Sequence, residues 1–193
     1  MTKFPKYLVG LTGSIASGKS TVLKELARLG ACTLSADELV RELYQTAQVR
    51  GQLEKWFGSA EPQEVADVVF KSETARKKVE DFLHPLVWQL AQAKLALCPK
   101  PWAVFEVPLL FEAGWDTKMD LIVLVTAGEQ TLAKRLQARG ISPDVYRTRR
   151  QTQLGEAEKM CRADITIFND TTPQALHKKA GYLYNTLKNL YEK

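Results

Sequence analysis

Residues 13–20 read G-S-I-A-S-G-K-S, which is an uninterrupted phosphate-binding-loop pattern, G-x-x-x-x-G-K-S. The glycines let backbone N–H groups curl around a polyphosphate without Cβ clashes, while Lys19 can reach its β- and γ-phosphates and Ser20 can bind Mg²⁺. The alternative is a glycine-rich turn beside a surface lysine. An apolar run at 7–11 and a helical pattern at 21–29 flank the loop as the motif requires, so we predict a nucleoside triphosphate site.

Asp37 stands just after a second expected strand, at the sheet edge where the phosphate-binding loop also lies. A carboxylate there can accept the proton of an acceptor alcohol or hold Mg²⁺ through water. The alternative is a helix N-terminal residue favoured by the dipole. Glu106 and Glu112 flank a Pro-Leu-Leu-Phe segment. Glu106 lies in an apolar run, so it needs a cation or Mg²⁺ nearby or a structural salt bridge, and both alternatives stay open.

The segment 135–162 carries seven basic residues against three acidic ones, most of the net charge of +5. Arg135 and Arg139 are four apart and share a helix face. As a group these bases favour contact with the phosphates of a nucleotide, and a solvated basic face is the alternative. His84 precedes Pro85 in an apolar helical pattern, and this position by itself favours a packing role for the side chain. The seven bases are Arg135, Arg139, Arg147, Arg149, Arg150, Lys159 and Arg162.

Near-continuous apolar runs predict strands buried on both faces, and therefore a parallel sheet between two helix layers. The first helix is expected to end at Gly30, and Pro85 predicts a kink or break. The strands are expected at 7–11, 32–35, 102–107, 121–125 and 165–168, and helices at 38–45 and 173–191.

The 193 residues predict a single domain with two helical insertions. The core is expected at about 1–37, 101–128 and 163–193, a substrate-binding helical insertion at about 38–100, and a basic lid of two helices joined near Gly140 at about 129–162. Helices that close over a phosphate-binding loop exclude water during phosphoryl transfer, so this organisation favours a kinase over a switch.

The composition, 45% hydrophobic and 25% charged, is that of a globular protein. Three separated cysteines, Cys32, Cys98 and Cys161, predict ordinary thiols in a reducing compartment. We find no signal-peptide pattern and no apolar run of membrane-spanning length, so a cytoplasmic protein without a membrane partner is expected.

Several segments together resemble the dephospho-CoA kinase family, in the family's order and over nearly the whole chain. His-Pro, Pro-Leu-Leu-Phe-Glu and Ala-Asp-x-x-x-x-Asn are more specific than the phosphate-binding loop. The segments are 11–21, Ser35-Ala-Asp37 with Arg41, Leu83-His-Pro-Leu-Val87, Val107-Pro-Leu-Leu-Phe-Glu112, Arg135-x-x-x-Arg139, Arg149-x-x-x-Gln153, Lys159, and Ala163-Asp164 through Asn169.

The resemblance implies a P-loop fold of three α/β/α layers with a five-stranded parallel sheet, a helical substrate-binding insertion and a basic lid. It implies transfer of the γ-phosphate of ATP, with Mg²⁺, to the ribose 3′-hydroxyl of dephospho-CoA, the last step of coenzyme A synthesis. Small-molecule substrates, no nucleic acid and a monomer are expected.

The resemblance also implies roles for individual residues. Catalytic roles fall to Asp37, Lys19, Arg139 and Arg149. ATP would be held by Gly13, Ala16, Ser17, Gly18, Lys19, Ser20, Thr21 and Asn169, with Asn169 near the base and Ser20 on Mg²⁺; the acceptor would be held by Asp37, Arg41, His84, Pro108 and Leu109.

Two departures from the family pattern stand out. Ser35 replaces the usual first aspartate of Asp-Ala-Asp, and residues 58–67 are shorter than usual and lack an arginine. The alternatives to this family are another small-molecule kinase on the same scaffold, a GTP-dependent switch, and a nucleic-acid-binding ATPase. The switch would need a guanine-reading Asn-Lys-x-Asp, which Asn169-Asp-Thr-Thr172 does not provide.

Overall fold

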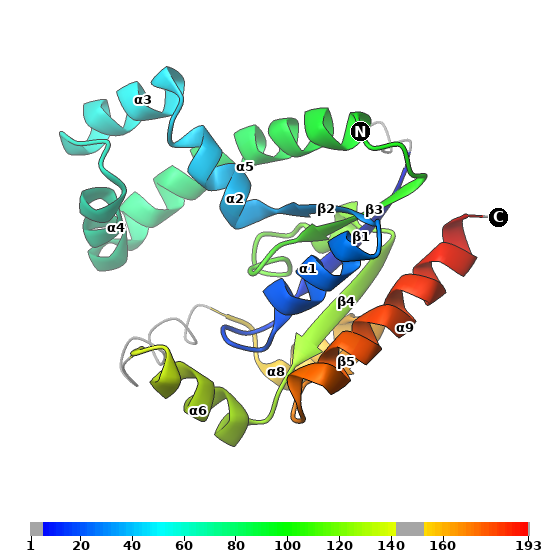
Figure 1. Cartoon of the computed structure of the whole chain (residues 1–193). Coiled ribbons are helices and arrows are strands. Elements are labelled where there is room, and N and C mark those ends of the chain that lie inside the picture. The colour runs from blue at the N-terminus through cyan, green and yellow to red at the C-terminus, as the bar shows by residue number, and fades with distance from the viewer. Residues whose placement is uncertain (1–5, 142–152, 193) are drawn as a thin grey trace. The chain divides into compact units, whose positions relative to one another are not determined.

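The computed structural model describes residues 6–141 and 153–192, which form two compact units (Figure 1). The core unit holds the chain up to Leu34 and from Cys98 onward, and the helical unit holds Ser35–Leu97.

The core unit is built on a five-stranded parallel sheet in the order β2-β3-β1-β4-β5, with helices on both faces. Parallel pairing places Leu11 opposite Glu106, and Thr126 opposite Phe168, so the ends of these strands meet at one edge. The three central strands are almost wholly buried, which explains their continuous apolar sequences. The strands are β1 Tyr7–Thr12, β2 Cys32–Ser35, β3 Trp102–Glu106, β4 Leu121–Thr126 and β5 Ile165–Phe168.

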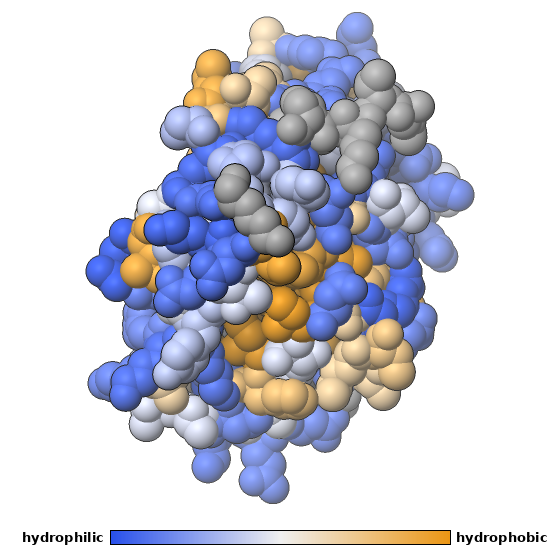
Figure 2. All heavy atoms as spheres, turned by 90° about the vertical axis from the view of Figure 1, so that its right-hand side faces the viewer, coloured by the Kyte–Doolittle hydropathy of each residue, from blue (hydrophilic) through white to orange (hydrophobic). Residues whose placement is uncertain are grey.

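Helices α1 and α9 pack against each other and the sheet around a core that includes Leu26, Val123 and Leu183. In α9, Thr172 caps the first turn by accepting from the Ala175 N–H at 3.3 Å, and Pro173 fits where no intrahelical N–H is needed. Among its described residues, the helices of this unit are α1 Lys19–Arg28, the short 3₁₀ turn η1 Asp116–Lys118, α6 Glu129–Ala138, α8 Glu156–Arg162 and α9 Pro173–Tyr191. Helix α9 lies on the side shown in Figure 2, where apolar residues gather amid a mostly hydrophilic face.

The helical unit packs around its own apolar cluster, which includes Val49, Leu53 and Leu83. Its first and last helices are also joined by an ion pair of 2.7 Å between Glu42 and Lys94. The helices are α2 Ala36–Leu43, α3 Ala47–Phe57, α4 Pro62–Lys71 and α5 Glu73–Ala96. No helix among the described residues is both long enough and apolar enough to cross a bilayer.

A kink or a break was predicted at Pro85; helix α5 continues through this residue, so the break does not occur. Proline cannot donate to the carbonyl of Asp81, but both residues are exposed and water can satisfy that oxygen. Leu83 and Val87 are 6% and 2% exposed, and this burial on either side of the proline holds the two halves of the helix in place. The first helix ends as predicted, with Gly30 in the left-handed conformation at φ 92°.

The prediction of three ordinary thiols is wrong for Cys32 and Cys98, which form a disulfide with a Cα–Cα distance of 6.1 Å. Cys161 is free and exposed. The pair is 66 residues apart in sequence, and only the sheet explains why it meets. Cys32 begins β2, Cys98 shortly precedes the neighbouring β3, and parallel strands begin at the same edge.

Candidate active site

The phosphate-binding loop joins β1 to α1 with backbone conformations that favour glycine. Gly13 and Gly18 have φ values of 146° and 108°, and Ala16 lies in the left-handed region at 63°. A Cβ on Gly13 would collide with the carbonyl oxygen of Val125, and a Cβ on Gly18 with the Asn169 amide nitrogen. The ends of the neighbouring strands therefore pack directly against the loop.

The Lys19 side chain folds over the loop and donates to the carbonyls of Gly13 at 2.6 Å and Ser14 at 3.0 Å. Ser20 follows on the first turn of α1 and is exposed, so its hydroxyl is open to a ligand. The helix N-terminus directs its N–H groups and its positive dipole end to the same place. Together these groups form a site for a polyphosphate anion.

Two side chains from later segments support the loop from outside. Arg135 of α6 donates to the carbonyls of Ala16 at 3.3 Å and Asn169 at 2.8 Å. The Asn169 amide donates to the carbonyl of Ser17 at 2.7 Å. In this structure Arg135 binds backbone carbonyls of the loop, a bracing role that its sequence position did not indicate.

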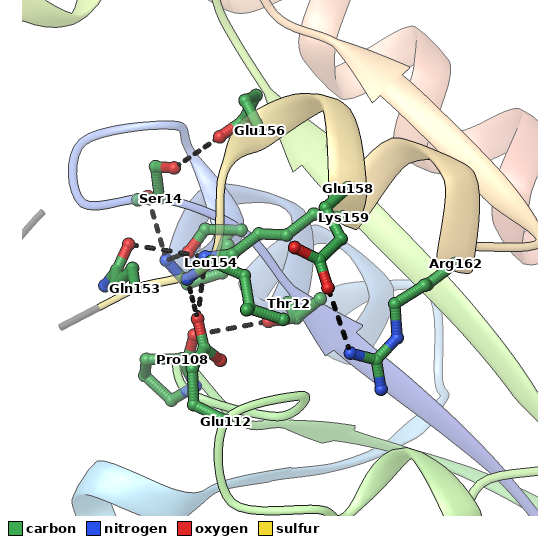
Figure 3. Close-up of polar contacts among 12 residues, drawn as sticks. Thr12, Ser14, Pro108, Glu112, Gln153, Leu154, Glu156, Glu158, Lys159 and Arg162 are labelled. Carbon is green, nitrogen blue, oxygen red and sulfur yellow. Dashed lines mark hydrogen bonds and ion pairs between the residues drawn. The ribbon is translucent and has the colours of Figure 1, made fainter. Parts of the chain in front are cut away.

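The start of α8 makes a second set of contacts beside the loop (Figure 3). Ser14 Oγ donates to the Glu156 carboxylate at 2.7 Å. Glu112, in the loop after β3, accepts from the Leu154 N–H at 2.8 Å and pairs with Lys159 at 3.3 Å. Glu112 and Lys159 are 47 positions apart, and no local sequence signal predicted that they would pair.

Lys159 and Arg162 do not fit the expected role of phosphate-contacting bases. Lys159 is fully buried against Glu112, and Arg162 pairs with Asp116 at 2.7 Å and with Glu158 at 3.7 Å. The packing of α8 beside the loop after β3 brings these opposite charges together.

Of the expected phosphate-contacting bases between α6 and α8, only Arg139 lies among the described residues. Arg139 caps the C-terminus of α6 and is exposed, so its guanidinium can reach a ligand. The positions of Arg147, Arg149 and Arg150 fall outside the described residues.

The expected acceptor-binding residues are divided between the two units. Asp37 and Arg41 are one turn apart on α2 of the helical unit and both are exposed, whereas His84 on α5 is partly buried. Pro108 and Leu109, both partly buried, follow β3 in the core unit. The Pro108 carbonyl accepts from Thr12 Oγ1 at 3.3 Å, which ties this segment to the strand that enters the phosphate-binding loop.

A pocket of about 310 Å³ opens beside the loop in the core unit. Ser14 and Glu156 line one part of it, and the ends of β4 and β5 line another, including Phe168 and Asp170 on either side of Asn169.

Glu106 is 4% exposed at the end of β3, and the two alternatives for its carboxylate stay open.

A phosphate-binding loop between the first strand of a parallel sheet and the helix that follows it defines the P-loop fold of nucleotide-binding proteins. The family model for dephospho-CoA kinase matches residues 7–174, and the chain belongs to this family. Its members catalyse the final, ATP-dependent step of coenzyme A biosynthesis, so the chain is an enzyme that acts in this step.

Individual relatives agree with this assignment. The dephospho-CoA kinase of Geobacter sulfurreducens is 34% identical over 185 residues, which cover 89% of this chain and 94% of the relative. The crystal structure of TT1252 from Thermus thermophilus matches with a TM-score of 0.84 and 29% identity, over 94% of this chain and 98% of that one. The dephospho-CoA kinase structure from Campylobacter jejuni, at 23% identity, has a TM-score of 0.71 over 95% of this chain and 98% of that one, which shows a shared fold.

Proposed function

We propose that the chain transfers the γ-phosphate of ATP to the ribose 3′-hydroxyl of dephospho-CoA at the site around residues 13–20. The observation that carries the proposal is the arrangement of Lys19 over the Gly13 and Ser14 carbonyls at the N-terminus of α1, in a chain of this family. A polyphosphate entering the loop would replace those carbonyls as the partner of the ammonium group, and the loop N–H groups would hold it.

Mg²⁺ would be held by the Ser20 hydroxyl together with oxygens of ATP and water. Magnesium commonly takes one or two protein ligands and completes its octahedron with phosphates and water. The exposed Ser20 hydroxyl is an oxygen donor that suits this pattern. Among the described residues, no three His, Cys, Asp or Glu side chains lie together so that they could hold a metal ion. Bound there, the ion would neutralise charge on the phosphates.

Asp37 would orient the ribose hydroxyl and take its proton, because it is an exposed carboxylate at the start of α2 that nothing in the described structure buries. Arg41, His84, Pro108 and Leu109 would contact dephospho-CoA. The nucleotide would lie along Gly13, Ala16, Ser17, Gly18 and Thr21, with its base near Asn169, and the adjacent pocket supports this placement. Arg139 and Arg149 would neutralise charge on the transferring phosphoryl group.

The single-domain division into core, insertion and lid stays a prediction, as do a cytoplasmic location, a monomeric state and the lack of a nucleic-acid partner. A strong, salt-dependent affinity for DNA or RNA would contradict the last of these.

The test is coupled ADP release with ATP and Mg²⁺, comparing dephospho-CoA with adenosine, AMP and no acceptor. The proposal predicts turnover that requires dephospho-CoA. Equal or faster turnover with adenosine or AMP would instead support another small-molecule kinase on this scaffold. ATP binding without turnover on any of these acceptors would contradict transfer to dephospho-CoA and would reopen the alternatives of a kinase with another acceptor and of a nucleotide-binding protein.

A further inference from the structure

Lys159 is a charged side chain that the proposed reaction does not use, yet it is buried completely. It lies on α8, and its amine contacts Glu112 at 3.3 Å and the Gln153 amide oxygen at 3.4 Å. Burying a charge costs several kcal/mol unless it is paired, and hydrophobic residues often replace such pairs without loss of stability. Stability alone therefore gives a weak reason for this pair, and its position suggests another.

The pair joins a segment that is bound to the end of β1, just before the phosphate-binding loop, to a segment that is bound to Ser14 of the loop itself (Figure 3). On one side, the loop that carries Glu112 is bound to β1 through Thr12 Oγ1 and the Pro108 carbonyl, and through the Val107 N–H and the Leu11 carbonyl at 2.9 Å. On the other, the first turn of α8 holds the Ser14 hydroxyl through Glu156 at 2.7 Å.

The connection within α8 is short. Lys159 and Glu156 are three residues apart on the same helix, and the Lys159 N–H donates to the Gly155 carbonyl at 3.0 Å. Glu112 also accepts from the Leu154 N–H, so one carboxylate fixes both the start of the helix and its buried lysine. A shift of Lys159 would therefore move Glu156, and with it Ser14.

We propose that Glu112 and Lys159 are positioning residues for phosphoryl transfer: by fixing the first turn of α8, they hold Ser14, through Glu156, where the loop N–H groups fit the phosphates of ATP. The inference rests on the proposed function of the loop in binding ATP. Misplacing a group by about 1 Å at such a site can cost on the order of a hundredfold in rate, which is why a remote pair can matter.

The test separates positioning from stability with two variants. Lys159→Met alone leaves the Glu112 carboxylate buried without its cation, so it should lower the unfolding temperature. Lys159→Met/Glu112→Gln removes both charges and should recover most of that loss. The proposal predicts that the double variant still has kcat/KM for ATP reduced on the order of ten- to hundredfold, with the KM for dephospho-CoA unchanged. Recovery of both stability and ATP kinetics in the double variant would overturn it.

The matched control is Asp116→Asn/Arg162→Gln. It neutralises another ion pair between α8 and the stretch of chain after β3, with a separation of 2.7 Å and with both side chains partly open to solvent. It should leave ATP kinetics unchanged, and an equal loss there would show that any change at α8 has the same effect.

Should the double variant fail to fold, Glu156→Ala tests the last link in the chain of contacts. It should raise the KM for ATP by itself, and combined with Lys159→Met it should add no further loss, because both act through Ser14. An unchanged KM, or fully additive losses, would overturn the proposal. Calorimetry of ATP binding without an acceptor makes the positioning test independent of the acceptor. If the wild type binds ATP but shows no turnover, the proposed function fails, and the ATP affinities of the variants still test the positioning role.

Discussion

The exposed carboxylate of Asp37 gives the most direct prediction at the scale of single residues. Replacement by asparagine keeps the shape but removes the base, and general-base catalysis contributes on the order of 10² to 10⁴ in rate. We expect Asp37→Asn to lower kcat by that order and to leave ATP affinity unchanged. Steady-state kinetics and ATP titration measure the two effects separately.

Glu38→Gln is the matched control, because Glu38 is the next residue on α2 and is also exposed. If Asp37→Asn retained near-normal turnover, or if Glu38→Gln lost as much, the carboxylate of Asp37 would not be the base.

Gly13 provides a second prediction at this scale, because its φ of 146° and its contact with the Val125 carbonyl leave no room for a side chain. Gly13→Ala should strain the loop by on the order of 1–3 kcal/mol and abolish detectable ATP binding. Chemical denaturation and ATP titration would measure the two losses. Gly51 lies within α3 with nothing near its would-be Cβ, so Gly51→Ala should stabilise the protein by about 0.5–1 kcal/mol. Equal behaviour of the two variants would contradict this account of the loop.

Between elements, α1 and α9 are joined by Glu25, which accepts from Arg28 and contacts His177 at 3.0 Å. The Arg28 hydrogen bond, aided by His177 and opposed by burial, lowers the pKa of Glu25 from 4.5 to about 2. A lowered pKa means that the folded state prefers the carboxylate. Its stabilisation is therefore complete above about pH 4.5 and is lost as the pH falls toward 2.

Urea unfolding of Glu25→Gln between pH 7 and pH 2 tests this contribution. The variant should be less stable than the wild type at pH 7, and the difference should shrink as the pH falls from 4.5 toward 2. Glu73→Gln is the control, since Glu73 also pairs with an arginine three residues on but is 88% exposed. A difference that stays constant with pH would contradict the proposed linkage.

The disulfide between Cys32 and Cys98 joins the two segments of the core unit that flank the helical unit. For its separation of 66 residues, the chain-entropy model gives about 4 kcal/mol of stabilisation. Reduction, or Cys32→Ser/Cys98→Ser, should lower the free energy of unfolding by up to that amount, and Cys161→Ser should not. In a reducing compartment the same two cysteines would be free thiols, close enough together to form the disulfide on oxidation. Equal stability with and without reductant would show that the bond does not form.

Local signals and long-range contacts differed in how well the sequence predicted them. The strand of residues 165–168 and the helix of residues 173–191 were predicted with the bounds observed, because apolar runs and a Thr-Pro start are local signals. The phosphate-binding loop was equally readable. Three contacts were not predictable, since each depends on which distant segments the sheet brings together. They are the Glu112–Lys159 pair, the hydrogen bonds of Arg135 to backbone carbonyls, and the disulfide.

For the molecule as a whole, the proposed reaction passes a single phosphoryl group from ATP to the ribose 3′-hydroxyl of dephospho-CoA. The measurement that tests it most directly is ³¹P NMR of the product formed by the full chain with ATP, Mg²⁺ and dephospho-CoA. We expect one new monoester signal, which is assigned to the 3′ position and grows in proportion to ADP. Phosphate released to water, or a phosphoryl group on another hydroxyl, would contradict it.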